Sequence, residues 1–234
     1  MLGRHAEGSA CVDAAGADGY YFQGGEMTRV DIMNNFVAAR GYTSYLEIGV
    51  SRGESLRGVK CRTKVGVDPD PRSAATVVKT SDDFFTGNRD TFDIVFIDGL
   101  HTSGQAWRDI RNSLAAIRPD GVVVLHDCLP PTPHAASPDP HGGEWCGDVY
   151  RAVAWYFSMS PYLCYTIDAD YGVGVIDTRH AARGFRAFPG DKMLDLTYDD
   201  FVKGRESIMH VVSPDAAASL CSGSGVERIE GVTA

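Results

Sequence analysis

The sequence predicts a doubly wound α/β domain, because short buried strands alternate with amphipathic helices. Four apolar runs are predicted strands, at residues 44–50, 64–68, 93–98 and 121–127. Each run is continuously apolar rather than alternating, which is typical of parallel strands covered by helices on both faces. A helical pattern between the third and fourth runs supports parallel strands joined by crossover helices.

The first helix is predicted within TRVDIMNNFVAARG, residues 28–41. Thr28 is a suitable N-cap, apolar residues recur at helical spacing, and Gly41 is a suitable stop. The preceding residues, 1–26, are rich in Gly, Ala and Asp and lack periodicity, which predicts a flexible N-terminal arm. We therefore expect the folded domain to span residues 27–213, followed by a frayed tail at 214–234.

The helix between the third and fourth strands is predicted in SGQAWRDIRNSLAAIRPDG, which ends at Pro119 and Gly121. After the fourth strand, residues 129–145 (LPPTPHAASPDPHGGEW) contain five prolines and are too long for a simple connection. The segment leaves the carboxyl end of a strand, where ligands of open α/β sheets bind. We expect it to cover the substrate.

The rest of the chain completes the sheet and its helical cover. A helix is predicted at 147–159, then a hairpin at 162–178 that turns near residues 169–172, then an amphipathic helix within 197–212.

Composition narrows the class of protein. A chain of 234 residues with 44% hydrophobic and 23% charged residues suits one globular domain. The net charge of -9, without a basic run, argues against nucleic acid and anionic membrane surfaces as partners. No apolar stretch is long enough to span a membrane. The cysteines form no CxxC pair, which predicts reduced thiols and a cytoplasmic protein: Cys11, Cys61, Cys128, Cys146, Cys164 and Cys221.

The most informative motif is YLEIGVSRG, residues 45–53. A strand enters a glycine turn that lets a ligand approach the backbone, and a helix beginning near Glu54 directs free N–H groups toward the same place. Asp68 ends the next strand, where a carboxylate can accept both hydroxyls of a ribose. Together these features predict a pocket for an adenosine-containing cofactor.

The glycine spacing separates two classes of cofactor. Dinucleotide-binding domains use GxGxxG, whereas Gly49 and Gly53 are spaced GxxxG. Glu47 would repel a phosphate and favour a cationic amino-acid group. The E-x-G-x-x-x-G pattern resembles the first motif of class I S-adenosylmethionine-dependent methyltransferases. That resemblance implies cofactor contacts by Glu47, Gly49, Ser51, Gly53, Asp68, Ser81, Asp82 and Asp98.

These residues also have a purely structural interpretation. Glycines after a strand often form only a turn, and Asp68 could cap a turn or helix. Ser81 and Asp82 could cap a short helix rather than lie near the adenine.

Two further motifs, IDGLH (97–101) and LHD (125–127), give the second part of the resemblance. With the flanking residues they resemble a bacterial branch of small-molecule methyltransferases that act on antibiotic sugars and are related to catechol O-methyltransferase. The resemblance covers about residues 28–178 and 198–211. It implies a Rossmann-like methyltransferase fold, with a mostly parallel seven-stranded sheet and an antiparallel C-terminal hairpin. It also implies that His101 is the general base.

Asp98 and Asp127 both end buried parallel strands, so we expect them in one crevice with the cofactor. Methyl transfer to a hydroxyl requires removal of its proton, by a general base or through acidification by a divalent cation. Oxygen ligands suit magnesium, which makes Asp98 and Asp127 predicted ligands together with His126. His126 stands where sugar-methylating relatives carry an acid. It could instead ligate a softer ion, contact substrate or point away, since adjacent strand residues face opposite sides.

Substrate contacts are predicted for Asp148, Trp145 and His141, near the proline-rich loop. Asp148 could equally cap the following helix, and loop histidines are often merely solvated. We therefore predict a cytoplasmic S-adenosylmethionine-dependent O-methyltransferase that acts on a hydroxyl of a small molecule, with a sugar or glycosylated natural product favoured. The alternatives are an NAD(P)-dependent oxidoreductase and a noncatalytic cofactor-binding protein. The sequence leaves homo-oligomerisation open.

Overall fold

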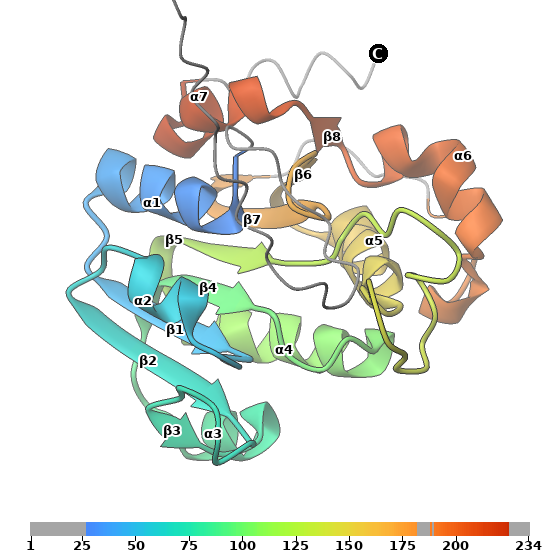
Figure 1. The fold of residues 1–234 in the computed structure, drawn as a ribbon. Coiled ribbons are helices and arrows are strands. Elements are labelled where there is room, and N and C mark those ends of the chain that lie inside the picture. The colour runs from blue at the N-terminus through green and yellow to red at the C-terminus, as the bar shows by residue number, and fades with distance from the viewer. Residues whose placement is uncertain (1–26, 182–187, 189, 225–234) are drawn as a thin grey trace, which may run out of the picture.

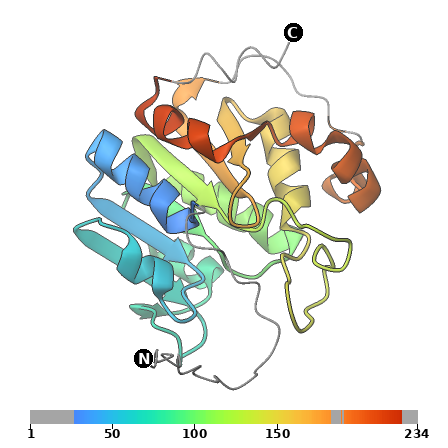
Figure 2. The ribbon, with the colours of Figure 1, turned by 45° about the horizontal axis from the view of Figure 1, so that its top comes forward.

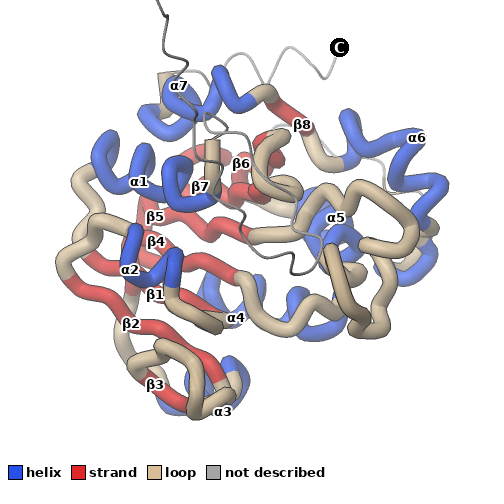
Figure 3. The backbone as a smooth tube through the Cα atoms, in the orientation of Figure 1, coloured by secondary structure: helices blue, strands red, loops and turns tan. Residues whose placement is uncertain are grey.

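The computed structural model describes residues 27–181, 188 and 190–224. Within them, strands form a central sheet with helices on both faces (Figures 1 and 3). The sheet has eight strands in the order β3-β2-β1-β4-β5-β7-β6-β8. Its strands are parallel from β3 to β5, while β7 runs antiparallel to both β5 and β6. This arrangement confirms the predicted Rossmann-like α/β fold with an antiparallel C-terminal hairpin. The predicted number of strands was wrong, because the described sheet has eight strands rather than seven.

The elements follow the predicted order along the chain. The strands are β1 (Ser44–Ile48), β2 (Thr63–Asp68), β3 (Val77–Val78), β4 (Phe92–Ile97), β5 (Ile117–Leu125), β6 (Tyr162–Ile167), β7 (Val173–Ala181) and β8 (Val211–Val212). The helices are α1 (Arg29–Arg40), α2 (Glu54–Gly58), α3 (Ser81–Gly87), α4 (Ser103–Ala116), α5 (Val149–Met159), α6 (Tyr198–Ile208) and α7 (Ala217–Ser222), with short 3₁₀ turns at Met193–Asp195 and Pro214–Ala216.

Local chemistry explains where α1 begins and ends. Thr28 and Asp31 form a reciprocal capping box at its start, and Gly41 ends it in the left-handed conformation at φ 65°. Both caps agree with the sequence prediction.

Strand register brings four carboxyl ends to one edge of the sheet. Ile48 of β1 pairs with Val67 of β2 and with Ile97 of β4, and Ile97 pairs with Leu125 of β5. The residues that follow these strands must therefore lie side by side at that edge, as expected for an open α/β sheet.

Two hydrophobic cores, one on each face, hold the helices to the sheet. On one face α1, α2 and α7 contribute Phe36, Leu56 and Leu220. On the other face α4, α5 and α6 contribute residues such as Ile110 and Phe157. The sheet therefore lies between two helical layers, as Figure 3 shows.

The structure adds elements that the sequence did not predict. Strands β3 and β8 have two residues each, so they carry no measurable periodicity. Part of the segment expected to be a frayed tail forms α7, which packs beside α1 (Figures 1 and 2). Leu220 and Cys221 are buried there, and Arg40 Nε donates to the Cys221 carbonyl at 2.8 Å. The predicted arm at 1–26 lies outside the described residues.

No helix in the described part of the chain is long and apolar enough to cross a membrane. The cysteines in that part are buried and form no disulfide. Cys11 lies outside it.

Candidate active site

A cavity of about 620 Å³ opens at the carboxyl edge of β1, β2 and β4. Its lining comes from the turn after β1, the end of β2, the start of α3 and the segment after β4. It includes most of the residues predicted to bind the cofactor: Glu47, Gly49, Ser51, Gly53, Asp68, Ser81 and Asp98.

The glycine turn allows the backbone of two strands to approach closely. Gly49 has φ 85°, and a Cβ there would collide with the carbonyl of Asp98. Gly53 has φ 75°, and its Cβ would lie 2.6 Å from the Cβ of Ala74. Both positions therefore require glycine, as the motif predicted.

Asp68 organises this turn. One carboxylate oxygen accepts the N–H groups of Val50 at 3.0 Å and Ser51 at 2.9 Å, and the other accepts the N–H of Asp70 at 2.8 Å. A carboxylate offers about four acceptor sites, so Asp68 retains capacity for a ligand hydroxyl. Its position fits both the predicted ribose contact and the structural interpretation.

Glu47 is a buried acid at the base of the cavity, with an exposed fraction of 2%. The hydroxyl of Tyr45 donates to its Oε2 at 2.7 Å. Burial raises the pKa of Glu47 to about 7, the Tyr45 hydrogen bond opposes this rise, and the nearby charge of Asp98 adds to it. A cationic ligand group in the cavity would stabilise the ionised form of Glu47.

The two residues predicted near the adenine separate in the structure. Ser81 lines the cavity and accepts a hydrogen bond from Gln105 at 3.0 Å. Asp82 is not among the lining residues. Its carboxylate pairs with Arg108 Nε on α4 at 3.3 Å, and Thr80 caps α3.

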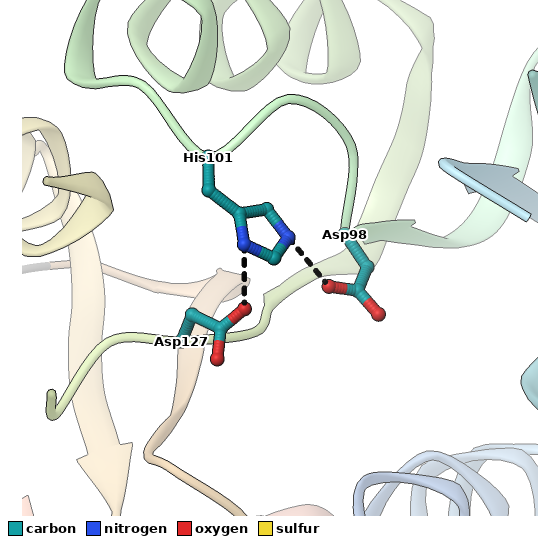
Figure 4. Close-up of side chains that lie close together, drawn as sticks. All are labelled: Asp98, His101 and Asp127. Atoms are coloured by element: carbon teal, nitrogen blue, oxygen red, sulfur yellow. Dashed lines mark ion pairs between the residues drawn. The ribbon is translucent and has the colours of Figure 1, made fainter. Parts of the chain in front are cut away.

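Asp98, His101 and Asp127 form a cluster beside the cavity (Figure 4). His101 Nε2 lies 3.4 Å from Asp98 Oδ1, and His101 Nδ1 lies 3.3 Å from Asp127 Oδ2. One ligand atom from each residue lies within 4.8 Å of the others, so the three could hold a metal ion. The structure therefore brings together the ends of β4 and β5, as predicted.

His126 faces the same two carboxylates from another side. Its Nδ1 lies 3.4 Å from Asp98 and 3.3 Å from Asp127, and its Nε2 lies 3.2 Å from Asp170 in the β6–β7 turn. Strand β5 ends at Leu125, and Asp127 has φ 59°, so strand alternation no longer separates neighbouring side chains. His126 therefore does not point away from the site.

Mutual pairing sets the charges in this cluster. Burial lowers the pKa of His126, but Asp127 and Asp98 outweigh it and raise that pKa well above its usual range. The same balance raises the pKa of His101, with Asp98 and Asp127 outweighing burial. In return, burial opposes ionisation of Asp98, but His126 and His101 hold its pKa well below the ordinary value.

Packing fixes the ring of His101. It stacks on Trp145 at a centroid distance of 5.0 Å, and its Nδ1 lies 3.0 Å from the Trp145 carbonyl. Gly147, at φ 64°, lies so close to the His101 backbone that a Cβ would collide with the His101 carbonyl. Of the three predicted substrate residues, Trp145 thus places its side chain against His101 of the cluster.

The other two predicted substrate residues have different surroundings. Asp148 is buried, and its carboxylate accepts the N–H and hydroxyl of Ser103 at 2.6 and 2.9 Å. It thereby ties the start of α4 to α5 and does not line the cavity. His141 stacks on His134 within the loop, and its Nε2 lies 2.7 Å from the His134 carbonyl.

Comparison with known proteins gives one family match. Residues 46–128, which run from β1 to just beyond β5, match the family model described as a methyltransferase domain. This part of the chain is therefore similar to methyltransferase domains. It contains the glycine turn, Asp68 and the clustered side chains of Asp98, His101 and Asp127. A search of curated proteins gives no match.

Solved structures with a similar fold include two O-methyltransferases. The enzyme from Bacillus cereus in complex with SAH has 13% identity and a TM-score of 0.47, covering 66% of this chain and 84% of its own. TomG from Streptomyces achromogenes, involved in tomaymycin synthesis and solved with SAM, has 18% identity and a TM-score of 0.46, covering 65% and 81%. At this similarity neither structure shows what this chain binds.

Sequence reasoning missed two residues of the site, Arg29 and Asp170. Arg29 Nη1 donates to both carboxylate oxygens of Asp170, at 3.1 and 3.0 Å, and also lies 3.4 Å from His126 Nε2. The two residues are 141 positions apart in the chain, and no local pattern links them.

Proposed function

We propose that this protein is an S-adenosylmethionine-dependent O-methyltransferase that acts on a hydroxyl of a small molecule. The observation that carries the proposal is one cavity lined both by a buried acid, Glu47, at the glycine turn and by an imidazole, His101, from the segment after β4. The first suits a cationic amino acid and the second suits a hydroxyl that must lose its proton.

The cavity residues fit the proposed cofactor. The Gly49 turn leaves room for a ligand against the backbone, Glu47 offers an anion to an ammonium group, and Asp68 offers acceptor capacity to a ribose. When bound, S-adenosylmethionine supplies an activated methyl group. What the chain must add is alignment of the acceptor oxygen and removal of its proton.

His101 is the proposed general base. The Trp145 stack holds its ring, and Asp98 and Asp127 stabilise the imidazolium that forms when it accepts a proton. The same carboxylates raise its pKa, so the neutral base becomes more abundant as the pH rises above the usual imidazole range. A positioned base contributes about 10²–10⁴-fold to such a reaction.

The two carboxylates of this cluster, together with His126, fit a divalent cation. Carboxylate oxygens of Asp98 and Asp127 converge with His126 Nδ1, whose other nitrogen faces Asp170. A carboxylate behind an imidazole is the usual support of a metal-binding histidine. We propose Asp98, Asp127 and His126 as ligands, with magnesium favoured by the oxygens and a softer ion by the imidazole. When bound, the ion would acidify the substrate hydroxyl.

We propose a sugar or a glycosylated natural product as the acceptor. The support is the polar loop at 129–145, whose Trp145 stacks on His101 next to the carboxylate cluster. An aromatic side chain beside acidic groups suits a polyhydroxylated ligand.

An NAD(P)-dependent oxidoreductase is the alternative on this architecture. The GxxxG spacing and the buried Glu47 disfavour a pyrophosphate, which three glycines would have to accommodate.

The test is turnover with S-adenosylmethionine and a panel of sugar and phenol acceptors, followed by mass spectrometry. We expect S-adenosylhomocysteine and an O-methylated product in equal amounts, both lost in His101→Gln. Binding of NAD without any binding of S-adenosylhomocysteine would overturn the proposal.

A further inference from the structure

Arg29, the first residue of α1, is a largely buried base in the lining of the cavity. Its side chain is 25% exposed, whereas Arg52, the other arginine of the lining, is exposed. Arg29 Nε donates to the hydroxyl of Ser55 at 3.3 Å and lies 4.0 Å from Asp98 Oδ2. Burying this charge is costly without partners, so its place in the cavity requires an explanation.

Asp170 pairs with the buried charge of Arg29. It accepts hydrogen bonds from Nη1 and from the backbone N–H of Arg29, the latter at 2.9 Å. Nη2 has no hydrogen-bond partner among the residues that the structure describes. Asp170 therefore orients the guanidinium while leaving donors for another anion.

Glu47 and Ser55 lie near Arg29 in the same cavity. Ser55 is buried, lines the cavity and is bonded to Arg29, and the Arg29 charge lowers the pKa of Glu47. This end of the cavity thus presents a carboxylate, a hydroxyl and a guanidinium close together.

An α-amino acid carries an ammonium and a carboxylate on one carbon. A site that pairs only the ammonium would leave the carboxylate desolvated beside Asp98 and Glu47, which would oppose binding. A protein carboxylate and a guanidinium side by side satisfy the ammonium and the carboxylate of the ligand. An arginine can bind a carboxylate through two hydrogen bonds.

We infer that Arg29, together with the Ser55 hydroxyl, binds the α-carboxylate of the amino-acid part of the cofactor. Asp170 is a positioning residue, because it acts through Arg29. This inference rests on the proposed function, since it takes S-adenosylmethionine as the ligand.

The test compares two ligands by isothermal titration calorimetry: S-adenosylhomocysteine and its decarboxylated counterpart, which lacks only the carboxylate. We expect the protein to bind S-adenosylhomocysteine about 10- to 100-fold more tightly, the value of a charge-assisted hydrogen bond. In Arg29→Gln most of this ratio should be lost, with the affinity for the decarboxylated ligand unchanged. Arg29→Lys should retain part of the ratio.

Arg72→Gln is the matched control, because Arg72 carries the same charge but pairs with Asp70 at the surface. Its ligand ratio should equal that of the unaltered protein. Asp170→Asn keeps the guanidinium and loosens it, so it should reduce the ratio by a smaller factor. If thermal denaturation shows that Arg29→Gln is unfolded, Asp170→Asn takes its place in the test.

Three results would overturn the inference: a ratio that survives Arg29→Gln, an equal loss of affinity for both ligands, or a ratio unaffected by Asp170→Asn. A failure of the unaltered protein to bind either ligand would instead remove the proposed function, and the inference with it.

Discussion

Binding of S-adenosylhomocysteine is expected to weaken as the pH falls through 7, because Glu47 must be ionised to pair with the ligand ammonium. Burial raises the pKa of Glu47 from an ordinary 4.5 to about 7. A carboxyl with such a raised pKa is largely neutral below pH 7. The ammonium stays protonated in that range, so the change in affinity reports on the protein.

The expected size follows from the ionised fraction of Glu47. About half of the Glu47 carboxyls are ionised at pH 7, and about one in eleven at pH 6. The apparent dissociation constant scales inversely with the competent fraction, so it should rise about fivefold between these two values. An ordinary glutamate would stay almost fully ionised, and the affinity would change by only a few per cent.

Calorimetry at pH 6 and pH 7 measures this change. Glu47→Gln should bind more weakly at pH 7 and lose most of the pH dependence. His101, whose pKa is raised by Asp98 and Asp127, is a second titratable group of the cavity, so His101→Gln serves as the control and should keep the fivefold change. An unchanged slope in Glu47→Gln, or tighter binding at pH 6, would show that ionisation of Glu47 does not control binding.

Three further outcomes are expected. His101→Gln should lower kcat by about 10²–10⁴-fold and leave the affinity for S-adenosylhomocysteine unaltered, and an unchanged kcat would contradict its role as base. Elemental analysis should find a divalent ion in the unaltered protein and none in Asp127→Asn; full activity of metal-free protein in a chelator would contradict the metal site. Asp177→Ala should lower the free energy of unfolding in urea by about 3–5 kcal/mol, because it leaves buried Arg40 unpaired, and a loss below about 1 kcal/mol would contradict this.

Long periodic elements and the cofactor motif were readable from the sequence. Helix α1 shows both of its caps in the amino-acid pattern, and Gly49 takes the left-handed turn that its motif predicts. The short strands β3 and β8 and the helix α7 were not readable, because their formation depends on pairing and burial against distant segments.

The candidate site was predictable where it follows strand ends and not where it depends on loops. Asp98 and Asp127 converge because parallel strands end at one edge. The inward position of His126 depends on the left-handed conformation of Asp127, which no residue pattern in the sequence predicts. Asp148 was predicted to contact the substrate, but in the structure its carboxylate accepts a hydrogen bond from Ser103 instead.

The most direct test of the account is calorimetric titration of the unaltered protein with S-adenosylhomocysteine, repeated on Gly49→Val. We predict one site per chain in the unaltered protein and no binding in the variant, whose side chain would collide with the Asp98 backbone. Absence of binding to the unaltered protein, or equal binding to both, would contradict it.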